Sequence, residues 1–126
     1  MGYWGEEVIL RVVVKAVNEI KRPVIGFFVK DKLGQSLFGD NTYLSYNEFP
    51  VLTTAGAHLM ADFVFCMPIL PVGSYSINVA VADGTQEDHI QLHWVHDAII
   101  FESQSDSVST GLVGIPMLKI NLKHVN

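Results

Sequence analysis

The residues between positions 89 and 97 include the side chains whose types and spacing could best hold a metal ion. On a helix, His89 and His93 would lie one turn apart and could ligate one zinc ion, with His96 and Asp97 nearby. On a strand, the two histidines would lie roughly 13 Å apart, too far for both to form bonds of about 2 Å to one ion. Apolar and polar residues alternate here, which predicts a strand with exposed polar histidines. We therefore expect no metal ion and no other cofactor.

Carboxylates could support glycoside hydrolysis, which needs two of them facing each other across a cleft. Five are available, namely Asp40, Glu48, Asp62, Asp97 and Glu102. No pair among them is singled out by its surroundings. The sequence also has no Gly-x-Ser-x-Gly motif and no phosphate-binding or dinucleotide-binding glycine motif. We expect no catalytic residue and no enzymatic activity, with a small glycan hydrolase as the alternative.

Charge and composition exclude two classes of partner. The 126 residues carry a formal net charge of −5 with only eight Lys and Arg, and no basic stripe that would bind nucleic acid. No apolar run is long enough for direct membrane insertion.

The one cysteine, Cys66, cannot form an intrachain disulfide and fits a reducing compartment. It lies among apolar residues and is predicted to belong to the core.

A period of two dominates the chain and predicts strands. The predicted strands are 7–17, 24–30, 35–38, 56–67, 74–82, 90–95, 98–103 and 113–122, with 43–54 as a loop. No segment shows a helical period. Many short strands in one chain of this length predict a single all-β domain over 1–126. We expect an antiparallel β-sandwich of immunoglobulin-like type, with a jelly roll as the alternative.

The clearest alternation, over 74–82, predicts a polar outer face. Tyr75, Ile77, Val79 and Val81 would point into the core, and Ser76 and Asn78 would point outward. If the strand 90–95 is a neighbour, Gln91 and His93 would lie beside them. Neutral hydrogen-bonding groups on a rigid sheet are typical of a sugar-binding surface, whereas an ordinary solvated face is the alternative.

Two further kinds of residue could complete such a surface. An exposed aromatic such as Trp4, Tyr43 or Tyr46 could lie against the apolar face of a sugar. Lys30 and Arg11 could bind an anionic group at the end of a glycan, with ordinary surface charge as the alternative.

The polar stretch 39–42 (GDNT) is predicted to be a structural corner, with ligand contact by Asn41 as the alternative.

Several motifs occur in an order that resembles one family. These are 23–31 (PVIGFFVKD), Gly34, 37–42 (LFGDNT), 63–65 (FVF), 70–75 (LPVGSY) and 96–102 (HDAIIFE). Over about 8–117 the chain resembles the C-terminal domain of the ATP-binding subunit of bacterial O-antigen polysaccharide ABC transporters, the Wzt type. Each motif is weak alone, and their order carries the resemblance.

The resemblance implies a function that composition does not show. It implies an immunoglobulin-like domain that binds the O-antigen polysaccharide at its modified non-reducing end and couples chain termination to export across the inner membrane. The implied partners are this polysaccharide, a second copy in a homodimer, and the ATP-binding and transmembrane parts of the transporter, at the cytoplasmic face of the bacterial inner membrane. The ATP-binding domain precedes this one in the family, so the chain is expected to be a fragment.

Two further expectations follow from the resemblance and its main competitor. In the family the C-terminal strand is exchanged between protomers, and here it would be 113–122, after a serine-rich segment. Glycan contacts vary between members, so Ser76, Asn78, Gln91, His93 and Lys30 are interpreted from alternation and chemistry alone. A protein-interaction β-sandwich is the alternative function, and it would need a large outward apolar patch. The outward faces that the pattern assigns are mostly polar or small.

Overall fold

The computed structural model describes residues 5–46, 48–84, 89–103, 113–115 and 117–124, and these form a small β-sandwich. Its elements are β1 (Glu7–Lys15), β2 (Pro23–Lys30), β3 (Ser36–Asn41), α1 (Tyr43–Tyr46), β4 (His58–Cys66), β5 (Gly73–Gly84) and β6 (His89–Ser103). No helix within these ranges is long and apolar enough to cross a membrane. The all-β prediction is confirmed.

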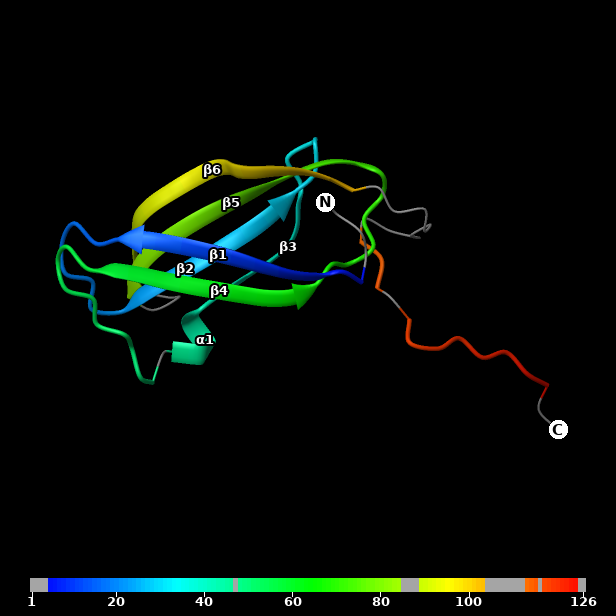
Figure 1. Ribbon diagram of the computed structural model, residues 1–126, viewed down its shortest axis with the longest axis horizontal. Coiled ribbons are helices and arrows are strands. Elements are labelled where there is room, and N and C mark those ends of the chain that lie inside the picture. The colour runs from blue at the N-terminus through cyan, green and yellow to red at the C-terminus, as the bar shows by residue number, and fades with distance from the viewer. Residues whose placement is uncertain (1–4, 47, 85–88, 104–112, 116, 125–126) are drawn as a thin grey trace.

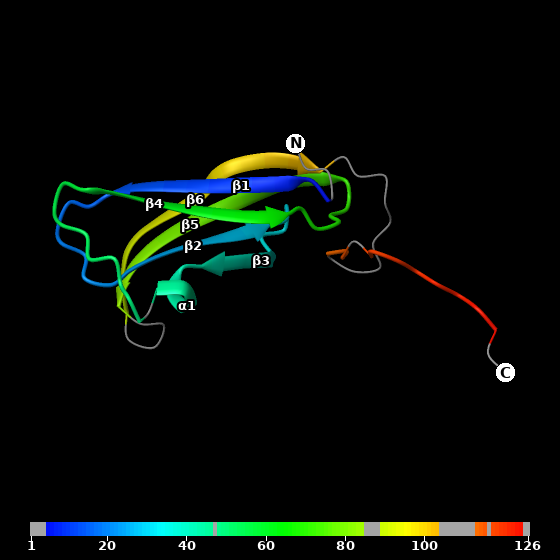
Figure 2. The ribbon, with the colours of Figure 1, turned by 60° about the horizontal axis from the view of Figure 1, so that its bottom comes forward.

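Two antiparallel sheets make up the sandwich (Figures 1 and 2). One contains β1 and β4, and the other has the order β3-β2-β5-β6. This arrangement matches the B and E strands facing the C′, C, F and G strands of a variable-type immunoglobulin domain. The immunoglobulin-like topology therefore holds, and the jelly roll does not.

A tyrosine near the start of β5 supports the same topology. The Tyr75 hydroxyl donates to the carbonyl oxygen of Pro71 at 2.6 Å, and its ring stacks on Phe101 with 5.6 Å between centroids. A tyrosine at the start of strand F that bonds to the backbone just upstream is the tyrosine corner of immunoglobulin-like sandwiches. Burial, with a smaller effect of Asp31, raises the pKa of the Tyr75 phenol.

The core lies between the two sheets. It is formed by the apolar residues that the period of two predicts to point inward. The two strands of the small sheet contribute Leu10, Val12 and Ala61, and the large sheet contributes Ile25, Phe27, Val29, Ile77 and Val81. The Phe27 ring contacts the rings of Phe63 and Phe65, at 4.9 and 5.8 Å between centroids. Burial of these side chains is the main favourable contribution to folding.

The predicted corner at 39–42 is structural. Asn41 Oδ1 accepts from the Tyr43 backbone N–H at 2.9 Å, and Thr42 Oγ1 accepts from the Ile25 N–H at 3.1 Å. A side-chain methyl at Gly39 would overlap with the carbonyl oxygen of Phe27, so only glycine fits on β3 at this position. These contacts join the corner to β2 and end the strand.

Three predicted elements differ from the structure. The strands 90–95 and 98–103 are one continuous strand, β6, because an irregularity in its pairing with β5 bends it without ending it. The loop 43–54 contains the short helix α1. Within the described part of 113–122, Gly114 forms an isolated bridge with Ile69, and no strand forms. The chain after it extends away from the sandwich (Figures 1 and 2).

The outward face of the small sheet is less polar than the sequence predicted. Ile9 pairs with Val64 and Val13 pairs with Met60, and all four are more than half exposed. Arg11 and Asp62 form an ion pair between them. Cys66 also lies on this face and is exposed, because its neighbour Phe65 takes the inward position on β4. The predicted core position of Cys66 is therefore wrong.

Candidate functional site

The outer face of the four-stranded sheet holds two of the five predicted site residues as direct neighbours. Strands β5 and β6 are adjacent, as assumed, and Lys30 on β2 pairs with Ser76 on β5. Both side chains are half-buried. Together with Ser74 and Asp97 they line a hollow of about 280 Å³. A hydroxyl, an ammonium and a carboxylate can meet a ligand here.

Gln91 lies on the same outer face but at its other end. It pairs with Ala82 and is exposed. Ala82 is roughly 20 Å along β5 from Ser76, given a rise of about 3.3 Å per residue. The predicted polar residues thus mark two ends of a face and do not meet at one point.

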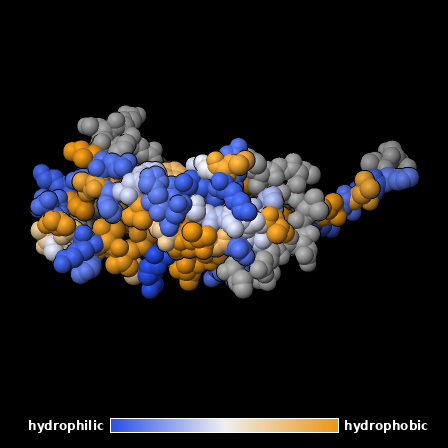
Figure 3. All heavy atoms as spheres, turned by 90° about the horizontal axis from the view of Figure 1, so that it is seen from above, coloured by the Kyte–Doolittle hydropathy of each residue, from blue (hydrophilic) through white to orange (hydrophobic). Residues whose placement is uncertain are grey.

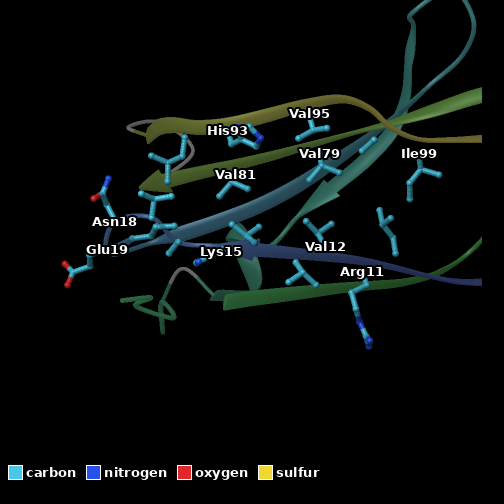
Figure 4. Close-up of a pocket in the computed structure, with 18 residues that line it drawn as sticks. Arg11, Val12, Lys15, Asn18, Glu19, Val79, Val81, His93, Val95 and Ile99 are labelled. Carbon is cyan, nitrogen blue, oxygen red and sulfur yellow. The ribbon is translucent and has the colours of Figure 1, made fainter. Parts of the chain in front are cut away.

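His93 does not lie on this face, which corrects the prediction. It pairs with Val81, a core residue, whereas Gln91 pairs with Ala82. The register between β5 and β6 shifts here, so an extra residue on β6 breaks the alternation that would have put Gln91 and His93 on one face. Figure 4 shows His93 with Val79 and Val81 on the inner side of the sheet.

Asn78 is also misplaced as a direct ligand contact, because it is only 3% exposed. A second register shift on β6 lies opposite it, and Asp97 there has φ of 53°. The Asp97 backbone N–H donates to Asn78 Oδ1 at 3.0 Å. Asn78 Nδ2 lies 3.4 Å from His96 Nδ1. The irregular part of β6 thus satisfies the Asn78 amide and buries it.

The sequence reading missed the most conspicuous feature of the outer face, a stacked aromatic pair. The rings of Phe28 and Trp94 lie 5.5 Å apart between centroids and 20° from parallel. They come from β2 and β6 and meet across β5, where Trp94 pairs with Ala80. Phe28 is 38% exposed. We call Phe28 and Trp94 the aromatic platform.

Small residues and one histidine surround the aromatic platform. Gly26 and Ala80 pair with each other beside it, and neither has a large side chain that would rise above the sheet next to the rings. The Trp94 indole Nε1 donates to His96 Nδ1 at 3.1 Å, which fixes the tryptophan ring. A signal existed in the sequence, because Phe28 alternates with the inward Phe27, but only the register brings Trp94 to it.

The other predicted candidates lie elsewhere. Arg11 donates to both carboxylate oxygens of Asp62 at 2.8 and 3.0 Å, on the small sheet, so it does not border the aromatic platform. Hydrogen bonding by Arg11 lowers the pKa of Asp62. Tyr43 and Tyr46 lie on α1, and Trp4 lies outside the described residues.

The structure also separates the groups considered for metal binding. Across the ranges that the structure describes, no three His, Cys, Asp or Glu side chains are grouped to hold a metal ion. His93 lies on the inner side of the large sheet and His96 beside the aromatic platform. The side chain of His89 is not among those described.

A groove follows the edge of β1 that faces β6. Its volume is about 710 Å³, and its walls include Leu10, Val12, Val79, Val81, Val95 and Ile99. Figure 4 shows the valines of β5 and β6 facing β1, with Arg11 pointing away. In the described part of the chain β1 pairs only with β4, so this edge is open.

Comparisons with known proteins agree with this geometry. A solved structure described as the C-terminal domain of Wzt matches with a TM-score of 0.80 and 19% identity, over 98% of this chain and 72% of the other. No curated protein sequence matches the chain. The family model described as the Wzt C-terminal domain matches residues 3–115. The chain therefore belongs to the Wzt C-terminal domain family.

Proposed function

We propose that this domain binds an O-antigen polysaccharide, without changing it chemically, on the outer face of its four-stranded sheet. The observation that carries the proposal is the aromatic platform. Sugars have apolar C–H faces that lie against aromatic rings and hydroxyls that need directed hydrogen bonds. Phe28 and Trp94 supply the rings, and polar side chains lie on either side of them along the sheet.

The distribution of polar groups suits an extended ligand. Ser76 and Lys30 lie at one end of the face and Gln91 at the other, roughly 20 Å apart. A polymer can contact both ends and the platform together. At the first end, the ammonium of Lys30 beside the Ser76 hydroxyl suits an acidic terminal substituent.

In the transporter, we infer that the domain reads the modified non-reducing end and so couples chain completion to export. It would act at the cytoplasmic face of the bacterial inner membrane, beside the ATP-binding and transmembrane parts. Family membership supports this role, since residues 3–115 match the Wzt C-terminal domain. The absence of enzymatic activity remains part of the proposal. Asp62, one of the carboxylates considered for hydrolysis, is engaged by Arg11 on the other sheet.

We further propose a homodimer in which the C-terminal segment of each copy enters the groove beside β1 of the other. Leu118, Ile120 and Leu122 alternate with polar residues and are each at least 85% exposed. Figure 3 shows this segment extending from the body with hydrophilic and hydrophobic residues in turn. The groove offers an apolar lining and an open strand edge, which an added strand requires.

The function is tested by calorimetry with two preparations of the host O-polysaccharide, one intact and one lacking its terminal modification. We expect binding to the intact form, and loss of roughly tenfold in affinity for Trp94→Ala, about 1.4 kcal/mol. Met60→Ala, an exposed change on the other sheet, should bind as the unmodified chain does. Equal binding to both preparations would contradict recognition of the modified end, and binding to neither would contradict glycan binding.

One observation favours a second function, contact with another protein. The outward face of the small sheet exposes Ile9, Val13, Met60 and Val64 around the Arg11–Asp62 pair. Exposed apolar rows of this kind are typical of protein interfaces. If the Met60→Asp chain still binds glycan but no longer associates with the transporter, this face is the contact surface.

A further inference from the structure

His96 lies beside the aromatic platform, and the hydrogen bonds around it determine which ring nitrogen carries its proton. The argument begins at the backbone N–H of Asp97, which can only donate. The Asn78 atom that it meets at 3.0 Å is therefore the oxygen Oδ1. This leaves the Asn78 nitrogen Nδ2, also a donor, 3.4 Å from His96 Nδ1.

A second donor reaches the same ring nitrogen. The Trp94 indole Nε1–H can only donate, and it lies 3.1 Å from His96 Nδ1. With two donors directed at it, Nδ1 must accept through its lone pair and cannot carry a proton. In a neutral imidazole the proton is then on Nε2. Buried Asn78 thus sets the tautomer of an exposed histidine.

The remaining nitrogen is free to meet a ligand. His96 is exposed, and the structure records no partner for its Nε2 among the described residues. The ring centroids of Trp94 and His96 lie 5.7 Å apart, with the planes inclined by 49°. A sugar lying against Trp94 would therefore have the histidine at its edge.

We propose that His96 is a ligand-binding residue of this face, whose Nε2–H donates to an oxygen of the sugar stacked on the aromatic platform. The proposal rests on the proposed glycan-binding function and adds a contact to it. A sugar lying against Trp94 presents its hydroxyls and its ring oxygen at the edge of the ring, and these are the acceptors that the Nε2–H would meet.

The tautomer is tested first, on the ligand-free protein. Long-range ¹H–¹⁵N spectra of the histidine rings in mildly alkaline buffer distinguish a protonated Nε2 from a protonated Nδ1. We expect His96, assigned by its absence in His96→Ala, to carry its proton on Nε2. A predominant Nδ1–H form would overturn the inference, and would leave glycan binding by the platform untouched.

A substitution of Asn78 tests the cause. In the double variant Asn78→Asp/Trp94→Phe the indole donor is also removed. One carboxylate oxygen still accepts from the Asp97 N–H, and the other becomes an acceptor facing His96 Nδ1. The ring proton is then expected to move to Nδ1. Trp94→Phe retains the Asn78 donor and should keep the proton on Nε2. If the aspartate variant does not fold, Trp94→Phe and the unmodified chain still decide the question, since a proton on Nδ1 in either contradicts the network.

The ligand contact is tested by calorimetry with the intact host O-polysaccharide. Loss of one neutral hydrogen bond in His96→Ala should weaken binding roughly threefold to tenfold. His58→Ala, an exposed histidine on the small sheet, is the matched control and should bind normally. If Trp94→Ala weakens binding and His96→Ala does not, the inference is wrong and the proposed function stands. If the unmodified chain does not bind, both fail.

Discussion

The side-chain oxygen of Asn78 accepts a hydrogen bond from the backbone N–H of Asp97, at 3.0 Å, across the β5–β6 pair. This bond occurs where the register of the two strands shifts and where Asp97 has φ of 53°. A positive φ is disfavoured for most residues, and aspartate is among those that tolerate it. The Asn78 amide replaces the strand partner that the shifted ladder does not provide.

Asn78→Ala is therefore expected to destabilise the domain by about 1–3 kcal/mol, because it leaves the Asp97 N–H without its acceptor and removes a buried amide. Urea unfolding followed by circular dichroism measures the change. Ser76→Ala, two residues away on the same face and half-buried, should stay within about 0.5 kcal/mol of the unmodified chain. Equal stabilities for the two variants would show that the bond does not hold the irregular part of β6.

The inward faces of the strands could be predicted because they depend on local alternation alone. The period of two predicts a core position for residues such as Tyr75, Ile77 and Val81, and all three lie in the core. The bend after β3 was also predictable, since the Asn41 side chain bonds to the Tyr43 N–H only two residues further along the chain. Both features need no knowledge of which strand pairs with which.

The candidate site depended on register, which the sequence does not show. One extra residue in β6 moved His93 to the inner face, and a second irregularity buried Asn78. The stacking of Phe28 on Trp94 needs three strands aligned in one register. Alternation assigns a face within one strand, but it cannot show where a partner strand is interrupted by a bulge.

The tyrosine corner provides a test of fold stability. Tyr75→Phe removes the 2.6 Å hydrogen bond to the Pro71 carbonyl and retains the ring that stacks on Phe101. We expect a loss of about 1 kcal/mol in the free energy of unfolding. Urea unfolding at neutral pH measures it. A variant as stable as the unmodified chain would show that the ring alone fixes the corner.

The same tyrosine predicts a dependence on alkaline pH. Burial raises the pKa of Tyr75 above the ordinary tyrosine value, so above that value the folded chain holds a proton that the unfolded chain has lost. The stabilisation is complete below about pH 10 and is lost as the pH rises through the folded pKa. The free energy of unfolding, measured at several values between about pH 9 and 11, should therefore decline more steeply for the unmodified chain than for Tyr75→Phe. Parallel curves would contradict the assignment.

Gly39 is expected to be the glycine on β3 that cannot be replaced. In Gly39→Ala the new methyl overlaps with the backbone carbonyl of Phe27, so one of the two paired strands must shift. Overpacking of this kind costs about 1–3 kcal/mol. Gly26→Ala is the milder comparison, because its methyl would meet the Asn41 Cβ at 3.2 Å and would not overlap with a backbone carbonyl as the methyl at Gly39 does. Thermal unfolding should rank Gly39→Ala well below Gly26→Ala, and the reverse order would show that β2 and β3 separate easily.

The C-terminal segment gives the sharpest test of the proposed homodimer. Ile120 is 85% exposed in the single chain, and the proposal buries it in the groove of the second copy. Burying one such side chain contributes about 1.5–3 kcal/mol, and a symmetric exchange counts it twice. Ile120→Asp should therefore raise the dimer dissociation constant at least a hundredfold, by roughly 3 kcal/mol or more.

Sedimentation equilibrium over a range of protein concentrations measures this change. Lys119→Ser is the matched control, since its side chain alternates with Ile120 and would face away from the groove. A monomeric Ile120→Asp and a dimeric Lys119→Ser would support strand exchange. If both variants remain dimers, the copies associate through another surface. The row of Ile9, Val13, Met60 and Val64 is then the first to examine, because all four side chains are more than half exposed.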